Sequence, residues 1–399
     1  MALTFSWEQR KLSEYLEVSN QKNTDDTFTK QDVLSVSGDF GIVNQIEFQG
    51  RSFAGASISN YGIVNTGDVV YTKSPLNSNP YGIIKANKGN PGIVSTLYAV
   101  YHPKSNVDSS FVQTYFEQHA RMNNYMHPLV NKGAKNDMKV SSENALKGYV
   151  IFPDIAEQRQ IVALFVKLDT LITLHQREYD KIVQVKKSML EKMFPKNGSN
   201  VPEIRFEGFT DAWEQRKLKD VASSFEYGLN AAAKEFDGTN KYLRITDIDD
   251  ASRAFRDDDL TSPDTNLSTA ENCRLNKGDL LFARTGASVG KSYIYRESDG
   301  LVYFAGFLIR ARIKPEYSAE FVFQNTLTPQ YEKYVLITSQ RSGQPGVNAQ
   351  EYGEYSFLMP NYSEQVKIGK FLHRIDNLIA LHQRKFMLFI KNNITHSQR

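Results

Sequence analysis

The sequence predicts an α+β protein in which two mixed α/β domains are separated by two long helices. The helices are expected to pair as an antiparallel coiled coil, and the whole chain to form a pseudo-twofold internal repeat. Three observations predict this fold: a hexapeptide that occurs twice, a second block that recurs at nearly the same offset, and two long stretches with heptad spacing of apolar residues. With 399 residues, the chain is long enough for two or three domains.

A tandem duplication underlies this prediction. The hexapeptide Trp-Glu-Gln-Arg-Lys-Leu at residues 7–12 occurs again 206 positions later, at 213–218, and contains both tryptophans of the chain. A second set recurs with an offset of 207: Pro153, Glu157, Gln158, Ile161, Asp169 and the tetrapeptide Leu-His-Gln-Arg at 174–177 match Pro360, Glu364, Gln365, Ile368, Asp376 and residues 381–384. Two blocks at almost one offset indicate that one unit was duplicated. The residues between the blocks share little, so we expect the two copies to bind different ligands.

The repeat divides the chain into four segments. We expect a first mixed domain at 1–150, a first long helix with its linker at 151–199, a second mixed domain at 200–357 and a second long helix at 358–399. In the first domain, strands are predicted near 67–72 and 93–100 and a helix over 109–124. In the second, strands are predicted near 242–248, 279–284 and 304–313 and a helix over 319–334.

The two long helices are predicted from apolar residues that follow one another at steps of three and four, which is typical of a coiled-coil seam. The predicted seam comprises Ile161, Leu164, Leu168, Leu171, His175 and Ile182 in the first helix and Ile368, Phe371, Ile375, Leu378, His382 and Phe389 in the second. At 1.5 Å per residue, a helix over 157–194 would be a rod of roughly 57 Å, which suits a spacer. Glu178 and Lys385 are equivalent positions of opposite charge, which favours pairing of the two different helices. Solvated helix ends are the alternative explanation.

Two histidines, His175 and His382, occupy equivalent seam positions. A histidine there is more often a polar residue that sets the helix register than a metal ligand, and we find no carboxylate or cysteine at ligand spacing. Cys273 is the one cysteine, which excludes an internal disulfide and a multi-cysteine metal site. We therefore expect no metal site in this chain.

Three motifs invite an enzymatic interpretation, and each is incomplete. Gly286-Ala287-Ser288-Val289-Gly290-Lys291-Ser292 follows a predicted strand, but a nucleotide-binding loop has four residues between its glycines and this one has three. Asn79-Pro80-Tyr81 lacks the second proline of the catalytic loop of amino-group DNA methyltransferases, and no glycine-rich cofactor loop precedes it. Asp137-Met138-Lys139 lacks the upstream Pro-Asp pair of a nuclease. We expect no catalytic residue and no bound cofactor.

Composition places few limits on function. The chain has 48 basic and 45 acidic residues, a formal net charge of +3, which is too close to balance to indicate a nucleic-acid partner. Hydrophobic residues make up 40% and charged residues 23%, which is typical of a folded globular chain. No apolar run reaches the ~20 residues of a membrane span, and residues 1–10 lack the apolar stretch of a signal peptide. We expect a soluble, cytoplasmic protein without a membrane partner.

The repeated elements together resemble the specificity subunit of a type I restriction-modification enzyme. The resemblance rests on the hexapeptide at both repeat starts, the Pro-x-x-x-Glu-Gln helix entries at Pro153 and Pro360, and the long helix after each variable block, and it covers the whole chain. Residues 232–238 with 242–248, and 281–286, are also similar to one class of target recognition domain in this family.

The resemblance implies that the two mixed domains are target recognition domains, each reading one half of a bipartite, asymmetric site in double-stranded DNA. It implies that the helices fix the gap between the halves and dock two methyltransferase subunits, with two restriction and translocase subunits in the full complex. S-adenosylmethionine, ATP and magnesium are then expected on those partners and none on this chain, which would be non-catalytic by itself. Reading DNA in this way requires basic side chains on phosphates and polar side chains on base edges.

The candidate DNA contacts are basic and polar residues of the two variable blocks. In the first block they are Lys73, Lys85, Lys88, Arg121, Lys132, Lys135 and Lys139. In the second block they are Lys234, Lys241, Arg244, Thr246, Arg284, Thr285, Lys291, Arg341 and Asn348.

Two other classes of function remain open at this stage. A coiled-coil scaffold that binds proteins and no DNA would explain the repeat and the seam equally well, and would bind with little dependence on salt. A free-standing ATPase or methyltransferase depends only on the incomplete motifs, and would turn over substrate as the purified chain.

Overall fold

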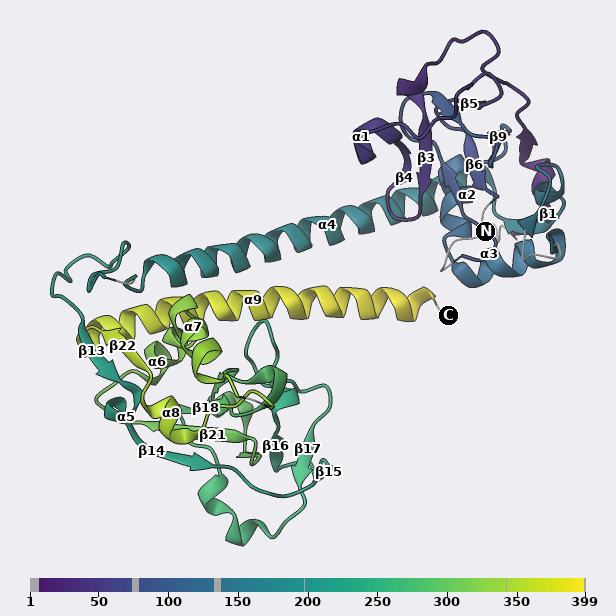
Figure 1. The fold of residues 1–399 in the computed structure, drawn as a ribbon. Helices are drawn as coiled ribbons and strands as arrows, with labels where there is room; N and C mark the ends of the chain where they lie inside the picture. The colour runs from purple at the N-terminus through teal and green to yellow at the C-terminus, as the bar shows by residue number, and fades with distance from the viewer. Residues whose placement is uncertain (1–6, 74–78, 133–137, 197, 342, 398–399) are drawn as a thin grey trace. The chain divides into compact units, whose positions relative to one another are not determined.

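The computed structural model describes residues 7–73, 79–132, 138–196, 198–341 and 343–397, with side chains omitted at 131, 132, 138, 139 and 385–397. The chain forms two compact units, Met1–Leu171 and Ile172–Arg399, called here the first and second unit. The boundary between them falls inside the long helix α4, Ile155–Lys192. Both units mix helices and strands, as predicted (Figure 1).

The first unit is built from short strands and three short helices that precede α4. Its strands are β1 (Glu8–Lys11), β2 (Leu16–Val18), β3 (Leu34–Ser37), β4 (Gly41–Asn44), β5 (Gly62–Val64), β6 (Val69–Thr72), β7 (Ile84–Ala86), β8 (Gly92–Val94), β9 (Tyr98–Pro103), β10 (Asn131–Lys132), β11 (Met138–Lys139) and β12 (Tyr149–Phe152). Its short helices are α1 (Gln45–Gln49), α2 (Ser109–Phe116) and α3 (His119–Met126).

The second unit has the same kind of composition and ends in a second long helix. Its strands are β13 (Glu214–Lys217), β14 (Ala222–Tyr227), β15 (Ala233–Glu235), β16 (Lys241–Leu243), β17 (Thr261–Pro263), β18 (Asp279–Ala283), β19 (Ser292–Ile294), β20 (Val302–Phe304), β21 (Leu308–Ile313) and β22 (Ser356–Met359). Its helices are α5 (Leu218–Val221), α6 (Ala319–Asn325), α7 (Pro329–Thr338), α8 (Ala349–Gly353) and α9 (Tyr362–Ser397).

Two sheets of each unit correspond strand for strand. A four-stranded sheet has the order β2-β9-β6-β7 in the first unit and β14-β21-β18-β19 in the second. The repeated hexapeptide forms β1 and β13, which pair antiparallel with β12 and β22, the strands that lead into α4 and α9. Every residue of β6 and β18 is buried, because these central strands are covered on both faces. The duplication seen in the sequence is therefore a duplication of topology.

The repeated helix entry has a structural cause. Gln158 is fully buried; its Nε2 donates to the carbonyl of Pro153 at 2.9 Å and its Oε1 accepts from the backbone N–H of Asp108 at 2.9 Å. Gln365 makes the equivalent bonds, with the carbonyl of Pro360 at 2.8 Å and the N–H of Ser318 at 3.0 Å. Each glutamine thus ties the start of a long helix to the residue that caps α2 or α6.

Several predicted elements are shorter than expected because local capping interrupts them. The helix predicted over 109–124 breaks between α2 and α3, and that over 319–334 breaks between α6 and α7. Thr328 caps α7 with its side chain and Pro329 occupies the first turn, an arrangement that begins a new helix. The strand predicted over 242–248 ends at Leu243, because the Asp247 carboxylate accepts the N–H of Arg244 and forms a 3₁₀ turn. The strands predicted over 93–100 and 304–313 are likewise each interrupted by a turn.

Within the second unit, the part of α4 after Leu171 lies antiparallel to α9 (Figure 1). Lys186 forms an ion pair with Asp376, and Gln383 Nε2 donates to the Tyr179 hydroxyl at 3.0 Å, so residue numbers rise on one helix as they fall on the other. Leu190 of α4 and Met193, which directly follows α4, belong to the same buried cluster as the apolar face of α9. At Gly369 a Cβ atom would lie 3.1 Å from the backbone nitrogen of Phe321, so glycine lets α6 approach α9 closely.

The predicted seam needs correction in both helices. Among the described side chains of α9, the buried apolar ones are Ile368, Leu372, Ile375 and Ile379, whereas the predicted Leu378 is 47% exposed and Phe371 is partly buried. The buried face is shifted because α9 packs against the globular core as well as against α4, which needs a wider apolar stripe than a coiled coil.

The predicted seam residues of α4 differ in burial and in the core against which they pack. Ile161 packs into the core of the first unit, Leu164 and Leu171 are exposed and Leu168 is partly exposed, whereas Ile182 packs against the core of the second unit. His175 and His382 are both partly exposed, and Phe389 and Lys385 lie outside the described side chains.

Candidate DNA-recognition surfaces

A recess of about 630 Å³ in the second unit gathers three of the candidate DNA contacts, Arg244, Thr246 and Arg284. It lies where β14, β16 and β18 end, and the turn between β20 and β21 closes one side. Gly228 makes the recess possible, because a Cβ atom there would lie 2.4 Å from the backbone oxygens of Phe304 and Ala305. The strand ends therefore bring residues far apart in sequence to one surface.

Arg284 is the best placed cation of this recess. Its guanidinium lies over the ring of Tyr227, 5.2 Å from the centroid, and its Nη1 reaches the carbonyl of Gly306 at 3.5 Å. Within the described part of the chain it has no carboxylate partner. A planar cation held on an aromatic ring and open to solvent is suited to a guanine edge or a phosphate.

Arg244 differs from Arg284 because its charge is already paired. Its Nε and Nη2 donate to the two oxygens of Asp247 at 2.9 and 2.8 Å, and this bond raises the pKa of the guanidinium above its usual value. Thr246 is exposed and its hydroxyl donates to Asp247 at 3.2 Å. Arg244 and Asp247 thus present a neutral, rigid pair of polar groups at the rim of the recess.

Sequence reasoning missed the aromatic side chains of this surface. Phe307 is 63% exposed and Tyr227 is 46% exposed, and both line the recess together with the exposed Asn230. Exposed aromatic residues next to cations are suited to contacts with bases and sugars. A single Tyr or Phe in a sequence cannot be told from a core residue, so no pattern pointed to them.

The other candidates of the second unit serve mainly internal contacts. Lys291 is buried, with its ammonium paired to Asp250 and donating to the Ile248 carbonyl at 3.1 Å, so it is unavailable to a phosphate. Arg341 pairs with Glu351, and Asn348 caps α8 by accepting from the N–H of the same Glu351 at 2.9 Å. Lys241 donates to the carbonyl of Asp299 at 2.7 Å.

Two further candidates of this unit have looser contacts. Lys234 has a half-exposed side chain, 3.9 Å from Asp264. Thr285 is partly exposed and its backbone bridges to Gly346.

The glycine-rich loop at 286–292 is closed to a phosphate. Four of its backbone N–H groups are already used: Gly286 donates to Pro345, Val289 to Gly286, Gly290 to Ala283 and Lys291 to Ser288, at 3.0–3.1 Å. A strand, β19, follows it instead of the helix that a nucleotide-binding loop requires.

The other two incomplete motifs lie in the first unit. The Asn79-Pro80-Tyr81 motif is a turn, closed by a bond from the Gly82 N–H to the Asn79 carbonyl at 2.9 Å. Asp137 lies outside the described residues.

The first unit carries a second recess, of about 490 Å³, lined by the β3–β4 turn, β7 and α2. Lys88 is exposed at its edge, whereas Lys85 is buried and its ammonium pairs with Glu117 at 3.0 Å. Lys85 is therefore removed from the set of free cations. Phe40, at 65% exposed, lines the same recess and was also missed.

The remaining candidates of the first unit lie apart from this recess. Lys73 is partly buried. Burial lowers the pKa of its ammonium, and the positive charge of Lys22 lowers it further. The Arg121 guanidinium lies over the Tyr115 ring at 4.3 Å. Lys132, Lys135 and Lys139 lie outside the described side chains.

Comparison with known proteins gives a match over part of the chain. Residues 210–386 match the model of the type I restriction modification DNA specificity domain. The chain is therefore similar to type I specificity subunits over its second unit. The matched range contains the recess with Arg284 and the second copy of the repeated helix entry.

One curated protein and one solved structure are similar to this chain. The specificity subunit of the type I restriction enzyme MjaVIII from Methanocaldococcus jannaschii is 23% identical over 246 residues, which cover 58% of this chain and 56% of that protein. The chain thus spans about half the length of this curated relative. The crystal structure of a type I restriction-modification S subunit from M. genitalium matches over 99% of this chain and 96% of its own, with a TM-score of 0.56 and 12% identity, which shows a common fold.

No helix in the described ranges combines the length and the hydropathy that crossing a bilayer would require. The long helices α4 and α9 carry charged residues throughout, as expected for helices that face water on one side.

Proposed function

We propose that this chain is the DNA-reading subunit of a type I restriction-modification complex and that each unit reads one half of a bipartite, asymmetric site. One observation carries the proposal: two units whose four-stranded sheets have the same strand order present different recesses. The recess of the second unit holds Arg284, Tyr227 and Phe307, and that of the first unit holds Lys88 and Phe40. A common frame with unlike surfaces suits recognition of two unlike half-sites on one duplex.

Within each half-site, the two kinds of side chain take different tasks. Exposed cations such as Lys88 and Lys234 position the unit on phosphates, which gives affinity that falls with salt. Arg284, Asn230 and Thr246 are suited to base edges, because arginine and amide side chains make paired bonds to guanine and adenine in the major groove. The Tyr227 ring holds the Arg284 guanidinium in place.

The long helices serve as a spacer between the two reading units. With 38 residues, α4 has a length of roughly 57 Å at 1.5 Å per residue, which prevents two recognition domains from sharing base pairs. The target should therefore be two short sequences separated by an unread gap whose length the helices set.

Catalysis belongs to the partners in this proposal. The duplicated frame offers two equivalent surfaces, around β1–β12 and β13–β22, to two copies of a methyltransferase subunit. Those subunits carry S-adenosylmethionine and methylate an adenine that is turned out of the duplex. Two restriction and translocase subunits use ATP and magnesium. The complex acts on DNA in the cytoplasm.

The proposal is tested by selecting binding sites from a library of random DNA duplexes with the full chain. The expected result is two short conserved blocks separated by a gap of fixed length. One contiguous block would contradict separate reading units. Binding without sequence preference, unchanged between about 50 and 200 mM salt, would favour a protein-interaction scaffold instead.

A further inference from the structure

Among its described residues, the second unit contains two clusters of side chains with the chemistry to bind a metal ion. One is Glu320, His373 and Asp376; the other is His175, Glu178 and His382. In each cluster, one ligand atom from every residue lies within 4.8 Å of the others. The two clusters differ in what already neutralises their acidic groups.

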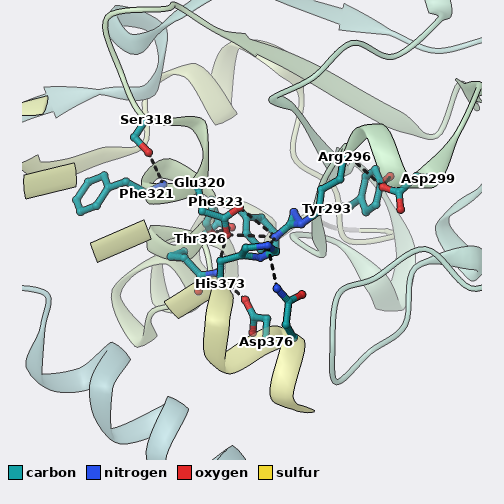
Figure 2. A network of polar contacts seen from close by, with 12 residues as sticks. Tyr293, Arg296, Asp299, Ser318, Glu320, Phe321, Phe323, Thr326, His373 and Asp376 are labelled. Carbon is teal, nitrogen blue, oxygen red and sulfur yellow. Dashed lines mark hydrogen bonds and ion pairs between the residues drawn. The ribbon is translucent and has the colours of Figure 1, made fainter. Parts of the chain in front are cut away.

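The first cluster is satisfied by cations of the protein itself. Figure 2 shows Glu320 of α6 beside His373 and Asp376 of α9, with Arg296 between them. Arg296 Nη2 lies 3.0 Å from Glu320 and donates to His373 Nδ1 at 2.9 Å, and Lys186 pairs with Asp376. Two carboxylates are balanced by two cations and the imidazole nitrogen is occupied, so a divalent ion would have to displace existing partners.

The second cluster has no such cations. Glu178 Oε2 lies 3.8 Å from His175 Nδ1 and 4.0 Å from His382 Nδ1, and among the described side chains no lysine or arginine pairs with it. The Nδ1 atom of His382 is buried without a hydrogen-bond partner among those side chains. A buried nitrogen without a partner is costly unless a ligand satisfies it. Our expectation of no carboxylate at ligand spacing was therefore wrong, because Glu178 follows His175 by one helical turn.

The duplication and the antiparallel pairing together produce this arrangement. His175 and His382 occupy the same position of the repeated Leu-His-Gln-Arg tetrapeptide. They lie in one cluster because α4 and α9 run in opposite directions and the two tetrapeptides lie at the same level of the pair. The equivalent of Glu178 in the second copy is Lys385, so the cluster has one carboxylate and not two. One histidine per copy thus becomes a two-histidine, one-glutamate set that spans two helices.

We propose that His175, Glu178 and His382 bind one divalent transition metal ion of the zinc class and join α4 to α9. Two imidazoles and one carboxylate form a three-ligand zinc set that leaves the fourth position to water. In a tetrahedral site, neighbouring ligand atoms are about 3.3 Å apart, given bonds of about 2.0–2.1 Å. The two separations that involve Glu178, 3.8 and 4.0 Å, exceed this value by less than an ångström, and the ligand atoms of the two histidines lie within 4.8 Å of each other. The partly exposed His175 and the exposed Glu178 have room to move inward.

The bound ion would fix the register of the two helices. The site lies eleven residues along α4 from the Lys186–Asp376 pair, so the helices are joined at a second, separate point. This site does not depend on the proposed function, because its ligands belong to the helices and not to either recess.

The test is titration of the purified, untagged full chain with Zn²⁺ by calorimetry, with Co²⁺ absorption as a probe of tetrahedral coordination. One ion per chain is expected, and His175→Ala, His382→Ala and Glu178→Gln should each weaken its binding at least tenfold. His373→Gln, in the first cluster, and His127→Gln, an exposed histidine of the first unit, should leave binding unchanged.

Two outcomes would overturn the proposal. One is absence of stoichiometric Zn²⁺ binding to the wild-type chain; the other is equal binding by the wild-type chain and all three ligand variants, which would mean an adventitious ion only. Glu178→Gln keeps the test decisive if a histidine variant does not fold, because Glu178 is largely exposed and its replacement leaves both imidazoles in place. DNA binding is not measured in this experiment, so its result is independent of the recognition proposal.

Discussion

Replacing Asp376 with alanine should destabilise the second unit by about 3–5 kcal/mol, the usual cost of leaving one partner of a buried ion pair without the other. Asp376 connects three helices: its carboxylate pairs with Lys186 of α4 and accepts from Gln324 Nε2 of α6 at 2.7 Å. The side chains of Lys186 and Asp376 are only 10% and 13% exposed, so water cannot replace the missing carboxylate. With an m-value of about 2–3 kcal/mol/M, the urea midpoint should fall by roughly 1–2 M.

The repeat supplies a matched control for this prediction. Asp169 is the equivalent residue of the first copy; it is exposed on α4 and belongs to the first unit, so Asp169→Ala should change the stability of the second unit by less than about 0.5 kcal/mol. Asp376→Asn keeps an acceptor for Gln324 but loses the charge, and should lie between the two. Replacing both members of the pair with apolar residues, Lys186→Met with Asp376→Leu, should restore stability to within about 1 kcal/mol of the wild type.

The assay is urea unfolding followed by the fluorescence of Trp213, in a Trp7→Phe background. Trp213 is buried in the same core as α9 and reports on the second unit alone, whereas Trp7 is 43% exposed in the first unit. Equal midpoints for Asp376→Ala and Asp169→Ala would refute the reasoning, since the buried pair would then contribute no more than an exposed carboxylate.

Three further predictions concern recognition and pH. Arg284→Ala should weaken binding of the selected duplex by about 1–3 kcal/mol and relax the preference at one base pair. Arg341 is paired with Glu351, so Arg341→Ala should change the affinity by less than about 0.5 kcal/mol. Fluorescence anisotropy measures both affinities, and equal losses would contradict the assignment of Arg284 to a base edge. Exchanging residues 13–150 for the insert of another family member should change one half-site only, as read by sequencing selected duplexes; a change in both would show that the units do not read independently. Hydrogen bonds from the Asn240 side chain and from the backbone N–H groups of Asn240 and Thr239 lower the pKa of Asp237 to about 2, so their stabilising effect is complete above the unfolded pKa of about 4 and is lost as pH falls through 2. Carbon-detected NMR titration of Asp237 should give a midpoint near 2, and a midpoint near 4 would contradict this.

The repeated part of the fold could be predicted because its sequence motifs occur twice in the chain. The hexapeptide and the helix entries recur at one offset, and in the structure they form the same strand pairs and the same glutamine contacts. The breaks inside the variable blocks could not be predicted in the same way. Thr328 and Asp247 end elements through single capping bonds, which leave apolar periodicity on both sides unchanged.

The candidate site was only partly predictable, because charge can be read from a sequence but exposure cannot. Lys85, Lys291 and Arg284 are all basic residues in or next to strands, yet the first two are buried with acidic partners, whereas Arg284 lines its recess without a carboxylate partner among the described side chains. Phe307 shows the opposite case: it is an apolar residue that the turn after β20 leaves exposed.

The glutamine that ties each long helix to its unit has a consequence for how such proteins change over time. Gln158 and Gln365 contact main-chain atoms: the carbonyl of a proline just before the helix, and the N–H of a residue inside the variable block, Asp108 or Ser318. Every amino acid other than proline supplies that N–H. A different variable block can therefore replace the present one before α4 or α9 without a compensating substitution at Gln158 or Gln365. The glutamine contact does not depend on the side chains of the variable block, so recombination of whole blocks can create a new sequence preference in one step.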